Sequence, residues 1–305
     1  MTKEPVLYDL IDVSDPEIAL TEIKQILALS VEGYGPAKLE MVYGDIVMLF
    51  RGNYPGYQAS NTKYHDLEHT NSVVLAAARL IHGCILAGMT FHVDNLMLGV
   101  YASLFHDVGL IQTKDDNVGS GAKYTVGHEQ RSILFMQKYM SEKDFPSQQI
   151  DDCSHLIMCT ILNLPPKEIP FRSREIETLG KIVGTADLMA QIADRYYIEK
   201  LLLLFQEFQE AGIPDFATEL DLLKKTEGFY KNVANQRLVH DFSGISTYMR
   251  AHFKQRYGVK KDLYSESIQK NIDYLRILLA RAGDSIVSVR ENLRRNVLGD
   301  TLPKS

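Results

Sequence analysis

Apolar residues recur at the spacing of an α-helix along almost the whole chain, whereas the strict apolar–polar alternation of a β-strand is scarce. The segment "SDPE" at residues 14–17 resembles a capping box with a proline in the first turn, so a helix is expected from there to about residue 32. Further helices are expected near residues 37–50, 65–81, 93–108, 128–140, 148–162, 174–210, 216–231, 242–257 and 265–295. The sequence therefore predicts an all-α fold.

The length and charge of the chain restrict its organisation and its partners. With 305 residues, no internal repeat and no clear linker, residues 1–305 are expected to form a single domain with a substantial core. The formal net charge of −6 argues against a broad basic surface for a nucleic-acid duplex or an anionic membrane.

The cysteines and the apolar segments indicate in which cellular compartment the protein is expected. Cys84, Cys153 and Cys159 are too few and too oddly numbered for a disulfide framework, and they show no zinc-type pairing. The first residues carry acids where a signal peptide needs a basic and then an apolar run, and no apolar stretch reaches the length of a membrane span. We expect a cytoplasmic protein.

Two histidines stand four residues apart in "YHDLEHT", residues 64–70. Residues at i and i+4 share one face of a helix, so His65 and His69 are expected to address the same point. The alternative is that both are polar residues exposed in a first helical turn.

The segment "LFHDVG" places His106 and Asp107 at the end of the most apolar predicted helix. An unpaired buried carboxylate costs several kcal/mol, and a metal ion would satisfy both side chains at once. The alternative is a histidine that interacts with the helix dipole next to a solvated aspartate.

A third candidate is Asp187 in "KIVGTADLMAQIADR". Val183 and Ala190 flank it at helical spacing, so it lies on an apolar stripe and is expected to point inward. Taken alone, an inward aspartate is more often a hydrogen-bond acceptor than a metal ligand. Together, two imidazoles and two carboxylates suit a divalent ion with water at its open positions, and Mg, Mn, Fe, Co, Ni and Zn all remain candidates.

The order H…HD…D, carried by His69, His106–Asp107 and Asp187, resembles the HD-domain superfamily of metal-dependent phosphohydrolases. The resemblance implies an HD-type helical bundle with its core at about residues 54–193, and it leaves a C-terminal helical extension at about residues 211–305. It further implies that the four side chains hold the metal.

"YHDLEHTNSV" is similar to the "YHNxxHaxxV" signature of class I cyclic-nucleotide phosphodiesterases. That similarity implies that His65 is the general acid and His69 a metal ligand, with Asp107 also counted in the catalytic centre. The chain departs from the signature in three places: Asp66 replaces the asparagine, the "HDxxHPG" continuation is missing, and Thr226 falls where the family has a purine-reading glutamine. A cyclic AMP or cyclic GMP substrate is therefore not assumed.

Residues near the His–Asp pair supply further candidates. In "GHEQRS", similar to other HD proteins, His128 is expected to bind a second metal with Asp107 bridging or to contact phosphate. Glu129 is expected to accept a proton from bound water or to orient His128, and simple exposure of both residues is the alternative. Asn163 stands where related two-metal proteins often have a histidine, which weakens a full two-metal site.

Three residues are candidate substrate contacts. Lys114 and Lys123, in the loop that follows the His–Asp pair, are candidate phosphate-binding cations. Tyr64 is expected either to line the pocket or to pack in the core.

These features predict a metal-dependent phosphohydrolase, specifically a phosphodiesterase acting on a small phosphorylated substrate such as a nucleotide. A nucleotide-sensing module without turnover is the alternative, and a two-iron oxidase is a third possibility for which the ligand set is incomplete. The helices after about residue 210 are expected to cap the pocket or to form a homodimer interface.

Overall fold

The computed structural model describes residues 5–293, and over these residues the fold is all-α, which confirms the prediction. The α-helices are α1 (Leu7–Leu10), α2 (Pro16–Ser30), α3 (Ala37–Phe50), α4 (Leu67–Leu86), α5 (Val93–Phe105), α6 (His128–Glu142), α7 (Ser147–Met158), α8 (Arg174–Ala193), α9 (Tyr197–Glu210), α10 (Glu219–Phe229), α11 (Met249–Tyr257), α12 (Leu263–Ala282) and α13 (Ile286–Asn292). Short 3-10 turns cover Val108–Leu110, Gly121–Tyr124, Pro166–Glu168 and Ile245–Tyr248, and two π-helical turns, Tyr230–Ala234 and Arg237–Asp241, follow α10.

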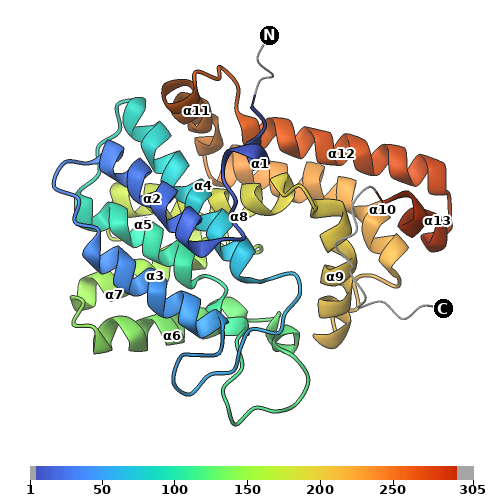
Figure 1. The fold of residues 1–305 in the computed structure, drawn as a ribbon, viewed down its shortest axis with the longest axis horizontal. Helices are drawn as coiled ribbons and strands as arrows, with labels where there is room; N and C mark the ends of the chain where they lie inside the picture. Colours follow the sequence, from blue (N-terminus) through green and yellow to red (C-terminus); the bar gives the residue numbers. More distant parts are fainter. Residues whose placement is uncertain (1–4, 294–305) are drawn as a thin grey trace.

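Helices α4, α5 and α8 form the centre of the molecule (Figure 1). Helix α4 packs against α2, α5, α8 and α11, and every residue from His69 to Cys84 except Ser72 is buried. Helix α5 is buried from Leu96 to Phe105, as its nearly continuous apolar sequence predicts. The candidate metal ligands thus lie on the most enclosed helices of the fold.

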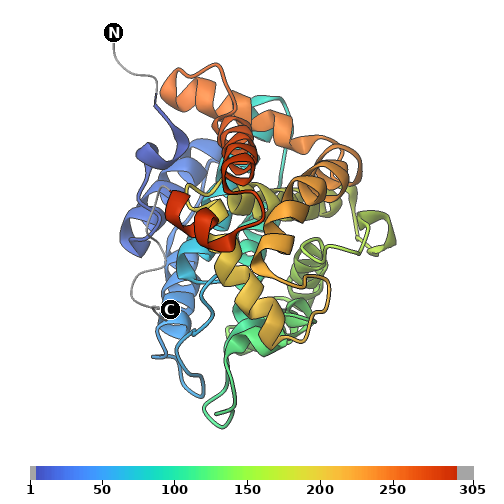
Figure 2. The ribbon, with the colours of Figure 1, turned by 90° about the vertical axis from the view of Figure 1, so that its right-hand side faces the viewer.

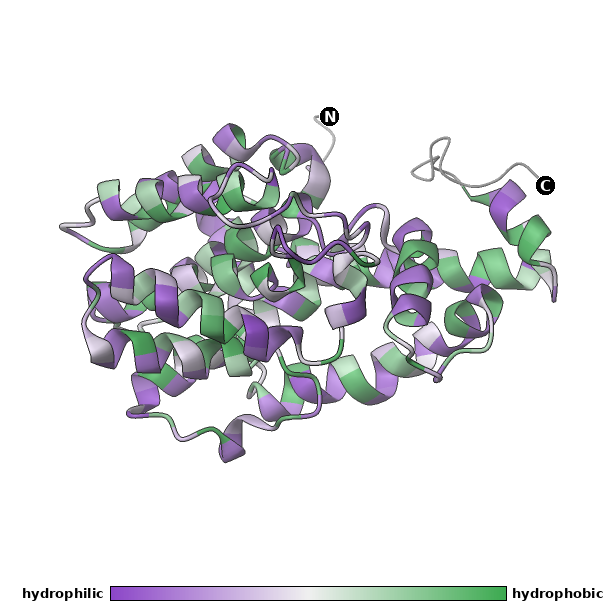
Figure 3. Cartoon of the chain, turned by 90° about the horizontal axis from the view of Figure 1, so that it is seen from below, coloured by the Kyte–Doolittle hydropathy of each residue, from purple (hydrophilic) through white to green (hydrophobic). Residues whose placement is uncertain are grey.

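The C-terminal helices gather on one side of this centre. Figures 1 and 2 show α9, α10, α12 and α13 together, with α12 running along the edge of the molecule. Helix α12 packs against α8, and α11 packs against α4. Figure 3 shows hydrophobic and hydrophilic residues alternating along the helices, which is the pattern of helices with one buried and one exposed face.

The predicted helix at residues 174–210 is wrong, because the chain turns between α8 and α9. Asp194 ends α8, its Oδ1 accepts a hydrogen bond from Tyr196 N at 2.7 Å, and its Oδ2 accepts one from Lys200 Nζ at 2.6 Å. Asn271 of α12 donates to the carbonyls of Ile192 and Asp194 at 2.8 and 2.7 Å. A side chain distant in sequence therefore satisfies the helix end, which periodicity along the chain does not reveal.

Several other predicted boundaries differ from the structure, and two of them have a clear physical reason. Helix α2 is capped by Asp15 rather than by Ser14, since Asp15 accepts from the amides of Glu17 and Ile18. The predicted helix at 265–295 breaks at Gly283, which adopts a positive φ of 57° and separates α12 from α13; residues 294–295 lie outside the described part.

The helices within residues 5–293 can be compared with a transmembrane span in length and in apolarity. None of them combines the length and the apolarity that a transmembrane span requires.

Candidate metal centre and adjoining cavity

His69 lies in the first turn of α4, where a cap fixes the helix start. The N-cap residue is Asp66, whose Oδ1 accepts a hydrogen bond from His69 N at 2.8 Å. The sequence predicted that His65 and His69 share one face of a helix, but His65 precedes the helix. The two rings nevertheless lie near each other, with centroids 6.0 Å apart.

His106 and Asp107 lie at the turn that ends α5, and both are buried. His106 Nδ1 donates to the carbonyl of Ser103 at 2.9 Å, so in the neutral imidazole the lone pair lies on Nε2. Ser132 of α6 donates to His106 O at 2.6 Å and accepts from Gly109 N at 2.9 Å, which fixes the turn against α6.

Gly109, two residues after Asp107, is required for close packing of α6 against this turn. A Cβ at this position would lie 2.1 Å from the carbonyl oxygen of His128 and 2.6 Å from Ser132 N. Because only glycine allows this approach, α6 can bring His128 up to the His106–Asp107 turn.

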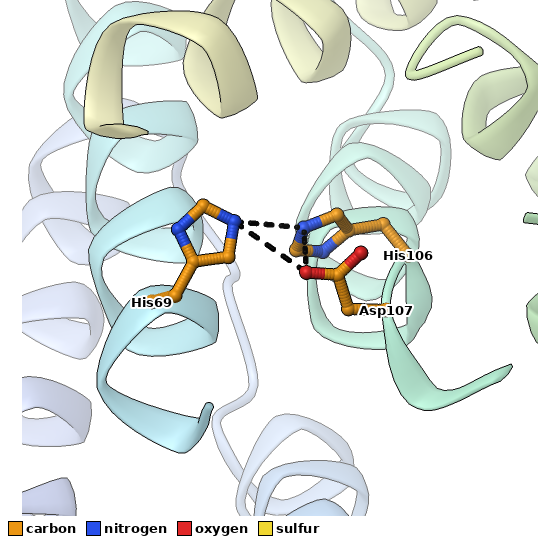
Figure 4. A group of neighbouring side chains, drawn as sticks. All are labelled: His69, His106 and Asp107. Atoms are coloured by element: carbon orange, nitrogen blue, oxygen red, sulfur yellow. Dashed lines mark hydrogen bonds and ion pairs between the residues drawn. The ribbon is translucent and has the colours of Figure 1, made fainter. Parts of the chain in front are cut away.

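The structure brings His69, His106 and Asp107 together from α4 and α5, as Figure 4 shows. The Nε2 atoms of the two histidines are 3.4 Å apart. Asp107 Oδ2 lies 3.1 Å from His106 Nε2 and 3.5 Å from His69 Nε2. Asp187 of α8 lies beside them, with Oδ1 3.4 Å from His69 Nε2 and 3.7 Å from His106 Nε2.

This arrangement suits a cation. Neighbouring ligand atoms that each lie about 2.1 Å from one ion are separated by about 3 Å, close to the 3.1–3.7 Å observed. Asp107 Oδ2 is buried and has no hydrogen-bond partner among the described residues, and a metal ion would supply the missing interaction. His69, His106 and Asp107 could therefore hold a metal ion.

Opposite charges dominate the electrostatics of this cluster. Burial alone would lower the pKa of His106, but the adjacent Asp107 carboxylate raises it to about 9. Burial would raise the pKa of Asp107, but His106 and His128 hold it well below its usual range. Asp107 is thus an anion at neutral pH despite its burial, as a metal ligand must be.

His128, at the start of α6, contacts the other oxygen of the same carboxylate. Its Nδ1 donates to Thr125 O at 2.8 Å, and its Nε2 lies 3.2 Å from Asp107 Oδ1. Glu129 Oε2 is 3.5 Å from His128 Nδ1. Although burial would lower the pKa of His128, Asp107 raises it to about 9. The structure thus joins His128 to the cluster through Asp107.

His65 is held by a residue that the sequence did not single out, Glu207 of α9. His65 Nδ1 donates to Glu207 Oε2 at 2.7 Å, while Oε1 accepts from the amides of Lys63 and Tyr64 at 2.8 and 2.7 Å. Burial would lower the pKa of His65, but the hydrogen bond to Glu207 and nearby acids raise it. The imidazolium form of His65 is therefore favoured more than in an ordinary histidine.

A cavity of about 370 Å³ opens beside these residues. His65, Asp107, His128 and Asp187 line its polar end. Its remaining wall is mainly apolar and comes largely from α8, α9, α10 and the α9–α10 connection: Leu188, Leu201, Leu204, Phe208, Ile213, Phe216, Leu222 and Phe229. The segment after residue 210 was expected to cap the pocket or to form a homodimer interface. In the structure it forms part of the pocket wall.

The predicted substrate contacts fall in different places. Tyr64 is buried and lines the cavity, with its ring centroid 4.7 Å from that of His65. Lys114 and Lys123 do not line it: Lys114 is exposed, and Lys123 pairs with Asp116. Asn163 is also exposed and outside the lining.

The cavity contains polar groups that sequence reasoning missed, among them Gln191, Asp215 and Lys225. Thr226 lines the cavity as well, but its hydroxyl donates to Leu222 O of its own helix at 2.9 Å. Nothing in the local sequence distinguishes these residues, because only the packing of α9 against α8 and of α10 against α9 brings them to the site.

Comparison with known proteins adds no relative: no protein-family model matches the chain, and no curated protein matches it significantly.

Proposed function

We propose that the chain is a metal-dependent phosphohydrolase of the HD type, and specifically a phosphodiesterase. The observation that carries the proposal is the convergence of His69, His106, Asp107 and Asp187 beside a cavity that also contains the carboxylate-paired His65. Metal ligands, a proton donor and space for a substrate thus share one site.

In this proposal the four side chains hold a divalent ion, drawn from Mg, Mn, Fe, Co, Ni and Zn. Such an ion supplies Lewis acidity to a phosphoryl oxygen and lowers the pKa of a water molecule that it binds. Asp107 Oδ1 also lies 3.2 Å from His128 Nε2, so in this proposal His128 would help to hold a second ion or would contact the substrate phosphate.

His65 acts as the general acid. Because Glu207 occupies Nδ1, Nε2 is the nitrogen left to donate a proton, and the raised pKa favours the protonated ring. Donation of that proton to the departing alkoxide oxygen leaves a neutral imidazole hydrogen-bonded to Glu207. Glu207 also ties this loop to α9, which orients the ring.

The lining favours a phosphodiester over more highly charged phosphates. Lys225 is the one lysine or arginine among the residues that line the cavity, and it already pairs with Asp221 at 2.9 Å. A diester carries one negative charge, whereas nucleoside triphosphates need several cations. The apolar wall, including the stacked rings of Phe208 and Phe216, suits an aromatic group such as a nucleobase.

Hydrolysis of bis(p-nitrophenyl) phosphate with Mn²⁺ or Mg²⁺ tests the proposal. Metal-dependent release of nitrophenol is expected from the wild-type protein, and Asp107→Ala should abolish it. Full metal-dependent activity in Asp107→Ala would reject the site. Calorimetric binding of nucleotides with no product formed would instead support the sensing module.

A further inference from the structure

The ring nitrogen of His69 that does not face the cluster has surroundings of its own. Nε2 points toward His106 and Asp107, and Nδ1 lies on the opposite side of the ring (Figure 4). The side-chain hydrogen bonds and ion pairs of His69 within residues 5–293 all involve Nε2. A histidine that binds a metal through one nitrogen almost always donates the other N–H to a carboxylate, a carbonyl or a water molecule. A partner for Nδ1 is therefore expected.

A small cavity lies against His69. It has a volume of about 10 Å³ and is lined by Tyr64, His69, Gln191, Asp194, Tyr197 and Lys200. His69 does not line the larger cavity of about 370 Å³, so the free edge of its ring faces the small one. A cavity of about 10–15 Å³ holds a single water molecule.

The lining of this small cavity suits water. All six of its side chains carry a polar group. An ordered water molecule in a protein interior needs two to four polar partners, and an apolar cavity stays dry. The size and the chemistry of the cavity therefore agree on one water molecule beside His69.

Asp194 is the acceptor that the structure holds most firmly in this lining. Its Oδ1 accepts from Tyr196 N at 2.7 Å and its Oδ2 from Lys200 Nζ at 2.6 Å. A carboxylate oxygen can accept more than one hydrogen bond, so both oxygens can still accept from water. Lys200 Nζ also lies 3.7 Å from Glu68 Oε1, which links the pair to the first turn of α4. An ionised acceptor binds water more strongly than the neutral amide of Gln191 does.

We propose that one ordered water molecule in this cavity accepts the Nδ1–H of His69 and donates to the carboxylate of Asp194, which makes Asp194 a positioning residue of the metal centre. With its proton held on Nδ1, the ring keeps the lone pair of Nε2 for a metal ion, and its orientation is fixed. Helix α8 would then contribute Asp187 to the cluster and orient His69 through its last turn. The inference rests on the metal site of the proposed function but not on hydrolysis.

A crystal structure of the wild-type protein, at a resolution that places ordered water, tests the bridge directly. Density for one water molecule is expected within about 3.2 Å of both His69 Nδ1 and an oxygen of Asp194. A side chain bonded directly to Nδ1, or the lack of a water molecule that reaches both groups, would overturn the proposal.

Binding of Co²⁺, followed by calorimetry and by visible absorption, tests the role of the bridge without a substrate. The double variant Asp194→Asn with Lys200→Met removes the anchored acceptor together with its counter-ion, so the net charge beside His69 is unchanged. The affinity for Co²⁺ should fall by about ten- to a hundredfold, the usual effect of losing a partner of a metal-bound histidine. The absorption bands of bound Co²⁺ should shift, because the imidazole is no longer held in one orientation.

The control is Asn271→Ala, which loosens the same turn without touching the cavity. It removes the hydrogen bonds to the carbonyls of Ile192 and Asp194, so it should lower the melting temperature but leave the affinity and the spectrum of Co²⁺ unchanged. The positioning role is overturned if the double variant binds Co²⁺ as tightly as the wild type, or if Asn271→Ala weakens binding equally. A wild-type protein that binds no Co²⁺ would instead reject the metal site of the proposed function, and this role with it.

Discussion

Glu207 lies 142 residues after His65 in the chain, yet its carboxylate accepts a hydrogen bond from His65 Nδ1 at 2.7 Å. The same carboxylate accepts the amides of Lys63 and Tyr64. One acid of α9 thus orients the loop before α4 and sets the charge of the proposed proton donor. This relationship links a wall of the cavity to the chemistry expected inside it.

Glu207→Gln is expected to reduce turnover without removing metal. The amide oxygen can still accept the backbone N–H groups, but the charge that raises the pKa of His65 is lost. We expect kcat to fall by about ten- to a hundredfold on diesters with alkoxide leaving groups, within the range for general acid catalysis. Nitrophenyl esters should be affected much less, since their leaving group needs no proton.

The control for Glu207→Gln is Glu142→Gln, on an exposed residue of α6, which should leave kcat unchanged. Metal analysis of each variant completes the experiment. An equal loss of rate on both kinds of ester would argue against proton donation by His65.

Loss of one proposed metal ligand should reduce the stabilisation of the folded protein by metal as well as its activity. A metal that binds only the folded state at 100 times its Kd adds about 2.7 kcal/mol to the free energy of unfolding. The melting temperature of the wild-type protein should therefore rise with added Mn²⁺ and fall with chelator. Asp187→Asn should remove most of this response, whereas Asp115→Asn, on an exposed aspartate, should keep it. An unchanged response in Asp187→Asn would exclude it as a ligand.

Sequence alone predicts those parts of the fold that are encoded locally. The all-α class follows from helical periodicity, and α3 has the predicted bounds, Ala37–Phe50, because its apolar pattern and its flanking turn residues agree. The turn at Asp194 was missed because apolar periodicity continues through it. The group that satisfies this turn, Asn271, is 77 residues away.

The same division applies to the candidate site. The sequence selected His69, His106, Asp107 and Asp187, and the structure gathers them, although their role as ligands remains a prediction. It could not select Glu207, which is one of 39 acidic residues and meets His65 only through the packing of α9. The loop lysines were chosen for proximity in sequence, which does not determine what lines a cavity.

Truncation of the apolar wall should weaken substrate binding more than it slows chemistry. Phe216 lines the cavity, and its ring stacks on that of Phe208 with centroids 5.6 Å apart. Its side chain has no group that could transfer a proton or bind a metal. Phe216→Ala is expected to raise KM by about ten- to thirtyfold for diesters with an aromatic group, equivalent to about 1.5–2 kcal/mol of lost apolar contact. The KM for dimethyl phosphate, a diester without an aromatic group, should change little. Leu134→Ala, on an exposed residue of α6, is the matched control. A fall in kcat at constant KM would contradict the assigned role.

Acid should destabilise the fold through a buried pair of histidines remote from the candidate site. His82 Nδ1 and His252 Nδ1 are 3.0 Å apart, and burial lowers the pKa of His252 to about 2 and also lowers that of His82. Both are neutral when folded, but each takes up a proton near pH 6.5 when unfolded, so the unfolded state is favoured as the pH falls below 6.5. The expected loss is about 1.4 kcal/mol per pH unit for each histidine that stays neutral.

His252→Asn retains a polar atom near the Nδ1 position but cannot titrate. The stability difference between it and the wild-type protein, measured by urea unfolding, should therefore shrink by about 2 kcal/mol between pH 6.5 and pH 5. A difference that stays constant over this range would show that His252 is not the group that responds to acid.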